Sequence, residues 1–152
     1  MAWTATHTRH ISVLRESTTG NDKSFTVGTE LGNKDWQISG VYVDYGANAT
    51  AGQRTVRLEV QDGSSNIIAS YEGGANSAID PGNTERLNFA AEATTLFAGQ
   101  VSDSGDPGTQ ELRQFPMPRM LLQKGSVFRV YDQEDISSND VLDVTVTVLS
   151  LF

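Results

Sequence analysis

The stretch VLDVTVTVL, residues Val141–Leu149, decides the fold class of this chain. Apolar and polar side chains alternate along it with a period of two, which places one set on each face of a β-strand. Its β-branched residues also favour strands. The same alternation occurs in RTVRLEVQ at Arg54–Gln61 and in SVFRVY at Ser126–Tyr131. The three segments predict strands with one buried and one solvated face, as antiparallel sheets have.

Further strand candidates are separated by turn-rich stretches. They lie at His10–Arg15, Ser24–Val27, Trp36–Tyr45, Asn66–Glu72, Glu85–Phe89 and Thr94–Phe97. Asp62-Gly63 predicts a hairpin turn, and Gly40 in the middle of its run indicates a bulge or bend. The segment Asn88–Phe97 could instead form about two helical turns. Roughly eight or nine short strands with this spacing predict an all-β fold, an antiparallel β-sandwich.

The composition limits the classes of function. The chain has 152 residues, no cysteine and a formal net charge of −8. Its length suits one domain, and it shows no linker and no internal repeat. Residues 1–152 are therefore predicted to form a single β-sandwich, with residues 1–8 as an extended arm. Phosphate backbones and anionic membrane surfaces repel so acidic a protein, so neither nucleic acid nor membrane is an expected partner.

No set of catalytic side chains stands out, and we predict a protein that is not an enzyme and uses no cofactor. His7 and His10 fall in the arm or first strand with no carboxylate nearby in sequence, so no metal site or triad is predicted there. The acidic loop Asp132–Asp140 could hold Ca²⁺ through oxygen ligands. It lacks EF-hand spacing, and solvated charges are the simpler interpretation. A hydrolase with paired carboxylates is a third hypothesis.

The most unusual segment is FPMPRMLL at Phe115–Leu122. Its two prolines remove backbone donors, so the segment can be extended but cannot form a central strand. Methionine and arginine are enriched at protein interfaces. Two alternatives follow: an edge strand that covers the open end of the core, or a subunit interface. The apolar end Leu149–Phe152 is likewise expected to pack within the domain or on a neighbour.

The stretch PMPRMLLQKGSVFRVYD at Pro116–Asp132, followed by a polar loop and a valine-rich strand, resembles small jelly-roll virion proteins of tailed bacteriophages. The resemblance covers Pro116–Leu149. It implies an eight-stranded, jelly-roll-like sandwich, a homotrimer and an arm that reaches neighbouring subunits. It further predicts a virion structural protein assembled in the host cytoplasm. Such a protein would be of the capsid decoration or cement type and would bind the major capsid protein or other virion proteins. The side chains expected at these interfaces are Trp3, Phe115, Met117, Arg119, Met120, Leu151 and Phe152.

The alternative function is a carbohydrate-binding or receptor-binding sandwich, with or without Ca²⁺. Such modules use exposed aromatic platforms, and Trp36, Tyr42 and Tyr45 share one segment. Strict alternation would put Trp36 and Tyr42 on one face and Tyr45 on the other. A platform of all three side chains is therefore not predicted.

Overall fold

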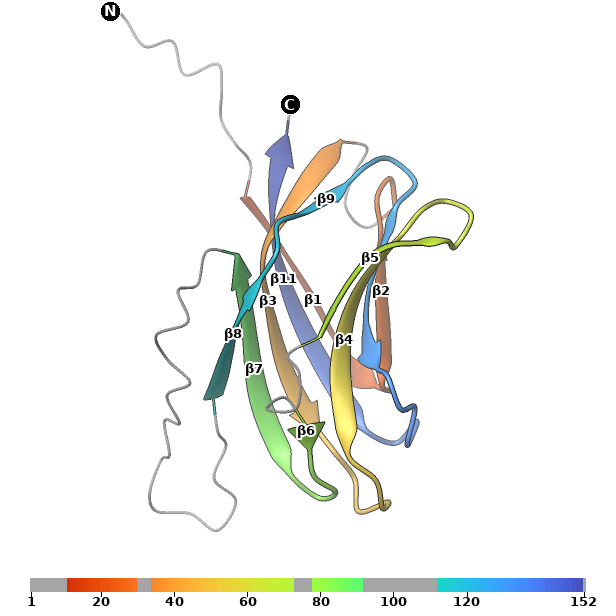
Figure 1. The fold of residues 1–152 in the computed structure, drawn as a ribbon, viewed down its shortest axis with the longest axis vertical. Coiled ribbons are helices and arrows are strands. Elements are labelled where there is room, and N and C mark those ends of the chain that lie inside the picture. The colour runs from red at the N-terminus through yellow and green to blue at the C-terminus, as the bar shows by residue number, and fades with distance from the viewer. Residues whose placement is uncertain (1–10, 30–33, 73–77, 92–111, 152) are drawn as a thin grey trace, which may run out of the picture.

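Figure 1 shows a computed structural model of the chain, which describes residues 11–29, 34–72, 78–91 and 112–151. Within these ranges every regular element is a β-strand, and the strands form two sheets. Sheet A has the order β1 (Ile11–Thr19), β11 (Val141–Leu151), β3 (Asp35–Gly46), β7 (Thr84–Ala91) and β8 (Leu112–Met117), with β9 (Met120–Leu122) also paired to β3. Sheet B has the order β2 (Asp22–Thr26), β10 (Val127–Asp132), β4 (Arg54–Gln61) and β5 (Ile67–Glu72), with β6 (Ala78–Ile79) also paired to β4.

Strand pairing follows a nested pattern. β1 pairs with β11, β2 with β10, β3 with β7 and β4 with β5, each pair antiparallel. Strands near the start of the chain thus pair with strands near its end, and strands in the middle pair with one another. This is the pairing of one long hairpin that is rolled up into two layers. The pairs β11–β3 and β10–β4 then complete the two sheets. Eight strands arranged in this way form a jelly roll, so the predicted all-β, jelly-roll-like sandwich is confirmed.

β3 contains the irregularity that Gly40 indicated. Neighbouring residues of β11 pair with Gly40 and with Ile38, so Ser39 is an extra residue. Such a bulge changes the phase of the side-chain alternation. Even-numbered residues of β3 face the core before the bulge, and odd-numbered residues face it afterwards.

This phase change corrects the prediction for the aromatic residues of β3. Trp36 and Tyr45 both face the core, with 7% and 0% exposure. Tyr42, which strict alternation would place with Trp36, lies on the outer face instead. The prediction failed because the extra residue lies between Trp36 and Tyr42. The segment therefore offers no aromatic platform.

The segment Phe115–Leu122 changes its neighbouring strand. β8 runs parallel to β7 at the edge of sheet A. Beyond the end of β7, β9 pairs with the part of β3 that β7 does not reach. Pro116 lies on the edge strand and Pro118 between the two strands, where a missing N–H group is tolerated. The edge-strand alternative therefore describes β8.

The core lies between the sheets and is filled by the inward-facing apolar residues of both. Phe89 of β7 stacks on Phe115 of β8 with ring centroids 5.2 Å apart. Tyr71 of β5 meets Phe89 edge-on at 6.1 Å and so joins the two sheets. Full burial of a large apolar side chain contributes about 1.5–3 kcal/mol to the free energy of folding. The core is therefore the main source of the fold's stability.

The predicted hairpin turn at Asp62-Gly63 joins β4 to β5. The Asp62 N–H donates to the Asn66 carbonyl oxygen at 2.9 Å, and Asp62 Oδ1 accepts from the Ser64 N–H at 2.8 Å. The helical alternative for Asn88–Phe97 is wrong for residues 88–91, which belong to β7 because their side chains alternate between core and solvent. Residues 92–97, with the strand candidate Thr94–Phe97, lie outside the described residues.

Candidate functional site

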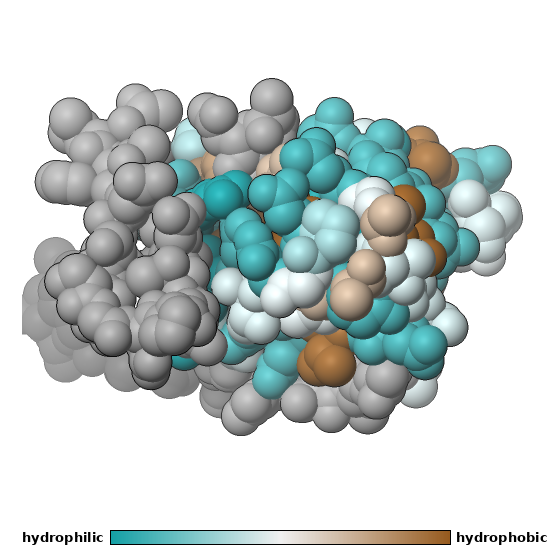
Figure 2. Space-filling view, turned by 90° about the horizontal axis from the view of Figure 1, so that it is seen from below, coloured by the Kyte–Doolittle hydropathy of each residue, from teal (hydrophilic) through white to brown (hydrophobic). Residues whose placement is uncertain are grey.

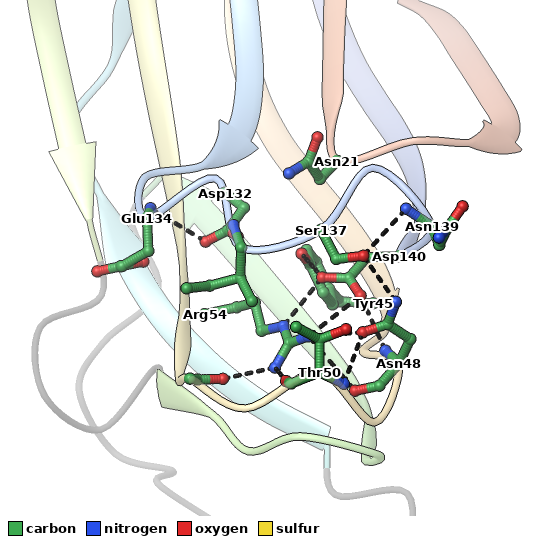
Figure 3. A network of polar contacts seen from close by, with 12 residues as sticks. Asn21, Tyr45, Asn48, Thr50, Arg54, Asp132, Glu134, Ser137, Asn139 and Asp140 are labelled. Atoms are coloured by element: carbon green, nitrogen blue, oxygen red, sulfur yellow. Dashed lines mark hydrogen bonds and ion pairs between the residues drawn. The ribbon is translucent and has the colours of Figure 1, made fainter.

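A network of buried polar side chains lies at the lower end of the sandwich and is enlarged in Figure 3. We call it the end network. It draws on the end of β3, the start of β4, the end of β10, the start of β11 and the loops between them. Arg54 shares the core face of β4 with Val56 and Leu58, and Asp140 continues the core face of β11 beyond Leu142. The alternation of side chains therefore places these two charged residues on the inner face at the ends of the strands.

Arg54 and Asp140 form the centre of the end network, and both side chains are fully buried. Arg54 Nε donates to Asp140 Oδ2 at 2.9 Å, and Nη2 donates to Oδ1 at 3.3 Å. The other guanidinium bonds go to the carbonyl oxygens of Thr50, Gly52 and Asn48 and to Asn48 Oδ1. All three nitrogens of the guanidinium thus have partners within the chain, as a buried cation requires.

Tyr45 and the Asn48 backbone complete the surroundings of Asp140. The Tyr45 O–H donates to Oδ2 at 2.8 Å, and the Asn48 N–H donates to Oδ1 at 2.8 Å. Burial alone would raise the pKa of Asp140, but hydrogen bonds from Arg54, the Asn48 N–H and Tyr45 hold that pKa below its usual value. Burial and the bond to Asp140 raise the pKa of Tyr45 far above its ordinary value. At neutral pH the carboxylate is therefore ionised and the phenol protonated.

Asp132 is a second buried carboxyl group, at the inward-facing end of β10. Its Oδ2 accepts from the Ile136 N–H at 3.0 Å, and its Oδ1 accepts from the Glu134 N–H at 3.2 Å. The Thr55 N–H donates to Glu134 Oε2 at 2.7 Å and to Asp132 Oδ1 at 3.3 Å. Burial raises the pKa of Asp132, although its backbone hydrogen bonds oppose the rise. Of the two buried carboxyl groups, Asp132 is the one that takes up a proton more readily.

The end network joins the loop before β4 to the loop after β10. Asn48 Nδ2 donates to Ser137 Oγ at 2.6 Å. Ile136 packs so closely on Gly52 that a Cβ there would lie 2.8 Å from Ile136 Cδ1. Gly52 also has a φ of +124°, which side-chain-bearing residues rarely adopt. The two loops are therefore held as one unit, and Figure 2 shows that the described surface at this end is mostly hydrophilic.

The end network has the chemistry of a structural clasp. Its central carboxylate and guanidinium are saturated by bonds within the chain, so neither is placed to exchange a proton with a substrate. The described residues contain no group of three or more His, Asp or Glu side chains that could hold a metal ion. The interpretation of Asp132 and Asp140 as solvated charges was wrong, because both are hydrogen-bonded at 2% exposure or less.

The end network was not predicted from the sequence, because its partners lie far apart in the chain, 86 residues for Arg54 and Asp140. A signal was nevertheless present. Arg54 and Asp140 have even residue numbers, as do the inward-facing apolar residues of the strands that they begin or precede. Alternation therefore predicts that both side chains point inward. A charged group on a buried face needs an opposite partner. An arginine and an aspartate in such positions therefore indicated a buried pair.

A second polar cluster lies on the outer face of sheet B. Arg129 Nε and Nη2 donate to the Asp22 carboxylate at 2.9 and 2.7 Å, and the guanidinium lies 3.7 Å from the centre of the Tyr131 ring. Glu59 is 1% exposed and accepts from the Tyr131 O–H at 2.8 Å and from Gln61 Nε2 at 2.6 Å. Burial and the bond to Glu59 raise the pKa of Tyr131. This face therefore presents a half-buried aromatic ring among polar groups in fixed positions.

The structure separates the predicted interface residues. Phe115, Met117 and Met120 face the core and are at most 8% exposed, so the chain itself already covers them. Arg119 is exposed. Outside the described side chains lie Trp3, Leu151 and Phe152. Core packing accounts for the apolar character of the first three, and an intersubunit role for the set stays a prediction.

Among the described residues the exposed large apolar side chains are Ile67 at 55%, Ile68 at 62%, Leu121 at 59% and Val141 at 45%. Leu121 alternates with the buried Met120 and Leu122, so it points away from the core. Ile67 and Ile68 lie where the β4–β5 register shifts. These three are at the end opposite to the end network (Figure 1), whereas Val141 begins β11 beside it. They are the unexplained apolar features of the described surface.

His7 and His10 lie outside the described residues. In the part of the chain that the structure describes, no helix is long and apolar enough to cross a membrane.

No protein-family model and no curated protein sequence matches the chain. Among solved structures, the infectious bursal disease virus Gx strain shows 10% identity and a TM-score of 0.30, over 94% of this chain and 42% of that one. A mutant VP2 protein of infectious bursal disease virus, in derived T=1 particles, shows 9% identity and a TM-score of 0.26, over 95% and 37%. The chain thus spans less than half the length of either. Likenesses this weak establish no shared function.

Proposed function

We propose that the chain is a structural protein of a virus particle, of the capsid decoration or cement type known from tailed bacteriophages. It acts as a homotrimer that binds the major capsid protein or other virion proteins, and it reaches the virion after assembly in the host cytoplasm. The resemblance of Pro116–Asp132 to such proteins supports the proposal. The end network supports it too, because its saturated groups favour a structural role over a catalytic one.

The observation that carries the proposal is the outward half of the segment Phe115–Leu122. Leu121 is 59% exposed between two buried neighbours, and Arg119 beside it is exposed. A single exposed leucine needs no explanation on an ordinary surface. Here it lies on a short strand that follows two prolines and is hydrogen-bonded to β3. A surface whose backbone is already ordered loses little conformational entropy on binding, and apolar and arginine side chains are what interface centres use.

The experiment that tests the proposal is binding to purified particles of the source virus. Mass spectrometry of the particles should detect the chain, and electron microscopy should show a jelly-roll density on their surface. In a reconstitution with particles that lack the chain, Leu121→Asp and Arg119→Glu should weaken binding. Val141→Asp, a matched exposed apolar position at the opposite end, should bind like the wild type. Absence of the chain from the particles contradicts the proposal.

A second candidate function, glycan or receptor binding, is favoured by one observation. The outer face of sheet B holds the Tyr131 ring with Arg129, Glu59 and Gln61 around it, and sugars bind to such combinations of an aromatic ring with fixed polar groups. A glycan array probed with the wild type and with Tyr131→Ala separates the two functions. Binding that is lost in Tyr131→Ala but kept in Leu121→Asp would favour this candidate.

A further inference from the structure

We propose that copies of this chain associate by placing Ile67 and Ile68 of one copy against Leu121 of another. The inference rests on the homo-oligomer in the proposed function and names its surfaces. We call Ile67 with Ile68 the isoleucine knob, and Leu121 with Arg119 and Lys124 the leucine patch. Each is built from described residues at the upper end of the sandwich in Figure 1.

The isoleucine knob is a fixed apolar projection. Asp62 Oδ1 accepts from the Asn66 N–H at 2.9 Å, and Oδ2 accepts from Asn66 Nδ2 at 2.9 Å, so the turn before the knob is tied to itself. Successive residues of a regular strand point to opposite faces. The register shift at the start of β5 breaks this rule, and both isoleucines are more than half exposed. The chain thus presents two adjacent apolar side chains on an ordered backbone.

The leucine patch combines an apolar centre with positive charge. Leu121 projects from β9, Arg119 precedes this strand and Lys124 follows it, and all three are exposed. The chain has only 11 basic residues and a net charge of −8. Two basic side chains on either side of an exposed leucine therefore depart from the overall charge of the protein.

The isoleucine knob follows a turn that carries a negative charge. Asp62 occupies this turn, whereas the exposed Glu72 lies at the far end of the same strand. Hydrogen bonds from Asn66 and Ser64 hold the pKa of Asp62 below its usual value, so this carboxylate stays ionised. Copies with a net charge of −8 repel one another except where opposite charges meet. The acidic knob and the basic patch provide such a meeting point.

Knob and patch adjoin on one molecule without being the same surface. A Cβ at Gly63 in the turn after β4 would lie 3.6 Å from the carbonyl oxygen of Gly125 in the turn after β9. Contacts between a knob and a patch can form a closed oligomer in two ways. In a dimer, the knob of each copy binds the patch of the other, and in a ring, the knob of each copy binds the patch of the next. In either arrangement a copy that lacks only its knob still offers an intact patch.

Sedimentation velocity of the full chain tests this inference. Ile68→Asp disables the knob and Leu121→Asp disables the patch, so each variant should self-associate more weakly by roughly tenfold or more, toward a 16.5 kDa monomer. An equimolar mixture of the two variants should regain association, because one contributes an intact patch and the other an intact knob. Val141→Asp is the control and should associate like the wild type.

A wild type that sediments as a monomer at every concentration would overturn the inference. So would knob and patch variants that associate like the wild type, or a mixture no heavier than its separate components. Circular dichroism and urea unfolding establish that each variant is folded. Particle binding is measured separately with Ile68→Asp, which leaves the leucine patch intact. If this variant binds particles and also self-associates like the wild type, this inference is contradicted and the proposed function stands.

Discussion

The two ends of the sandwich differ in where their polar and apolar groups lie. At one end Arg54 and Asp140 are completely buried and paired with each other. At the other end Ile68 and Leu121 are exposed at 62% and 59%. Charged side chains are buried at the end where they hold two loops together. Apolar side chains are exposed to solvent at the other end, where the fold does not require them. The difference indicates that the first end serves folding and the second serves binding.

The largest expected effect is at the buried end. Arg54→Met should lower the free energy of unfolding by about 3–5 kcal/mol, because Asp140 would remain as a buried charge without a partner. Urea unfolding followed by circular dichroism measures it. Arg86→Met is the control, since the ion pair of Arg86 with Asp44 is long at 3.7 Å and partly exposed. The control should change stability by less than about 1 kcal/mol, and an equal loss in both variants would contradict the role given to the end network.

The loop contact gives the next largest effect. Gly52→Ala should lower the free energy of unfolding by about 1–3 kcal/mol, because the positive φ and the close contact with Ile136 both resist a Cβ. The double variant Gly52→Ala/Ile136→Ala tests the second cause and should lose less than the sum of the two single changes. Gly63→Ala is the matched control, since its φ is not positive and its Cβ would meet only an ordinary contact. A Gly52→Ala protein as stable as this control would argue against a tight junction of the loops.

The two buried carboxyl groups of the end network, Asp140 and Asp132, predict opposite effects of pH on stability. The folded pKa of Asp140 is lowered, so its contribution to stability is present above about pH 4 and lost as the pH falls through the folded value. The folded pKa of Asp132 is raised, so its contribution is present below the unfolded pKa and lost as the pH rises through the folded value.

The measurement is urea unfolding between pH 4 and pH 7, for the wild type and for Asp132→Asn. The variant lacks the group whose contribution to stability is lost as the pH rises. Its stability relative to the wild type should therefore improve as the pH rises through the folded pKa of Asp132 and then level off. The asparagine changes a hydrogen bond as well, which shifts the whole curve but not its slope. Parallel curves would refute the raised pKa of Asp132.

The smallest effect on folding is expected at the exposed end. Leu121→Ser and Ile68→Ser should each change the free energy of unfolding by no more than about 0.5 kcal/mol, because neither side chain contributes to the core. Thermal unfolding at a concentration where the protein is monomeric measures this. A loss of several kcal/mol in either variant would mean that the side chain is needed for folding, and the contrast between the two ends would fail.

The strands were predictable because alternation is a local property. Arg54–Gln61 is a predicted strand and an observed one with the same bounds, and the bulge at Gly40 follows from one glycine inside an alternating run. The consequence of that bulge was not predictable, because a glycine in such a run indicates either a bulge, which adds a residue and reverses the alternation, or a bend, which does not. Trp36 and Tyr42 were placed on one face for this reason and lie on opposite faces.

Contacts between distant segments were the part that sequence alone could not supply. Nothing in Phe115–Leu122 indicates that β8 runs parallel to β7 and that β9 moves to β3. For the same reason Phe115 and Met120 were predicted as interface residues from their chemistry, whereas the residue that points outward from β9 is Leu121. Deciding between these neighbours requires the register of β9, which only pairing with β3 fixes.

The nested pairing also determines when the molecule can finish folding. Ile11 pairs with Leu149, so β1 finds its partner only after almost the whole described chain has been synthesised. Proteins dominated by such distant pairings fold slowly, in milliseconds to seconds. Until β11 emerges from the ribosome, β3 lacks one of its neighbours among the described strands and β1 has none of them, and their open edges can join other nascent copies. Keeping those edges apart at high expression is therefore a demand that this topology places on the cell.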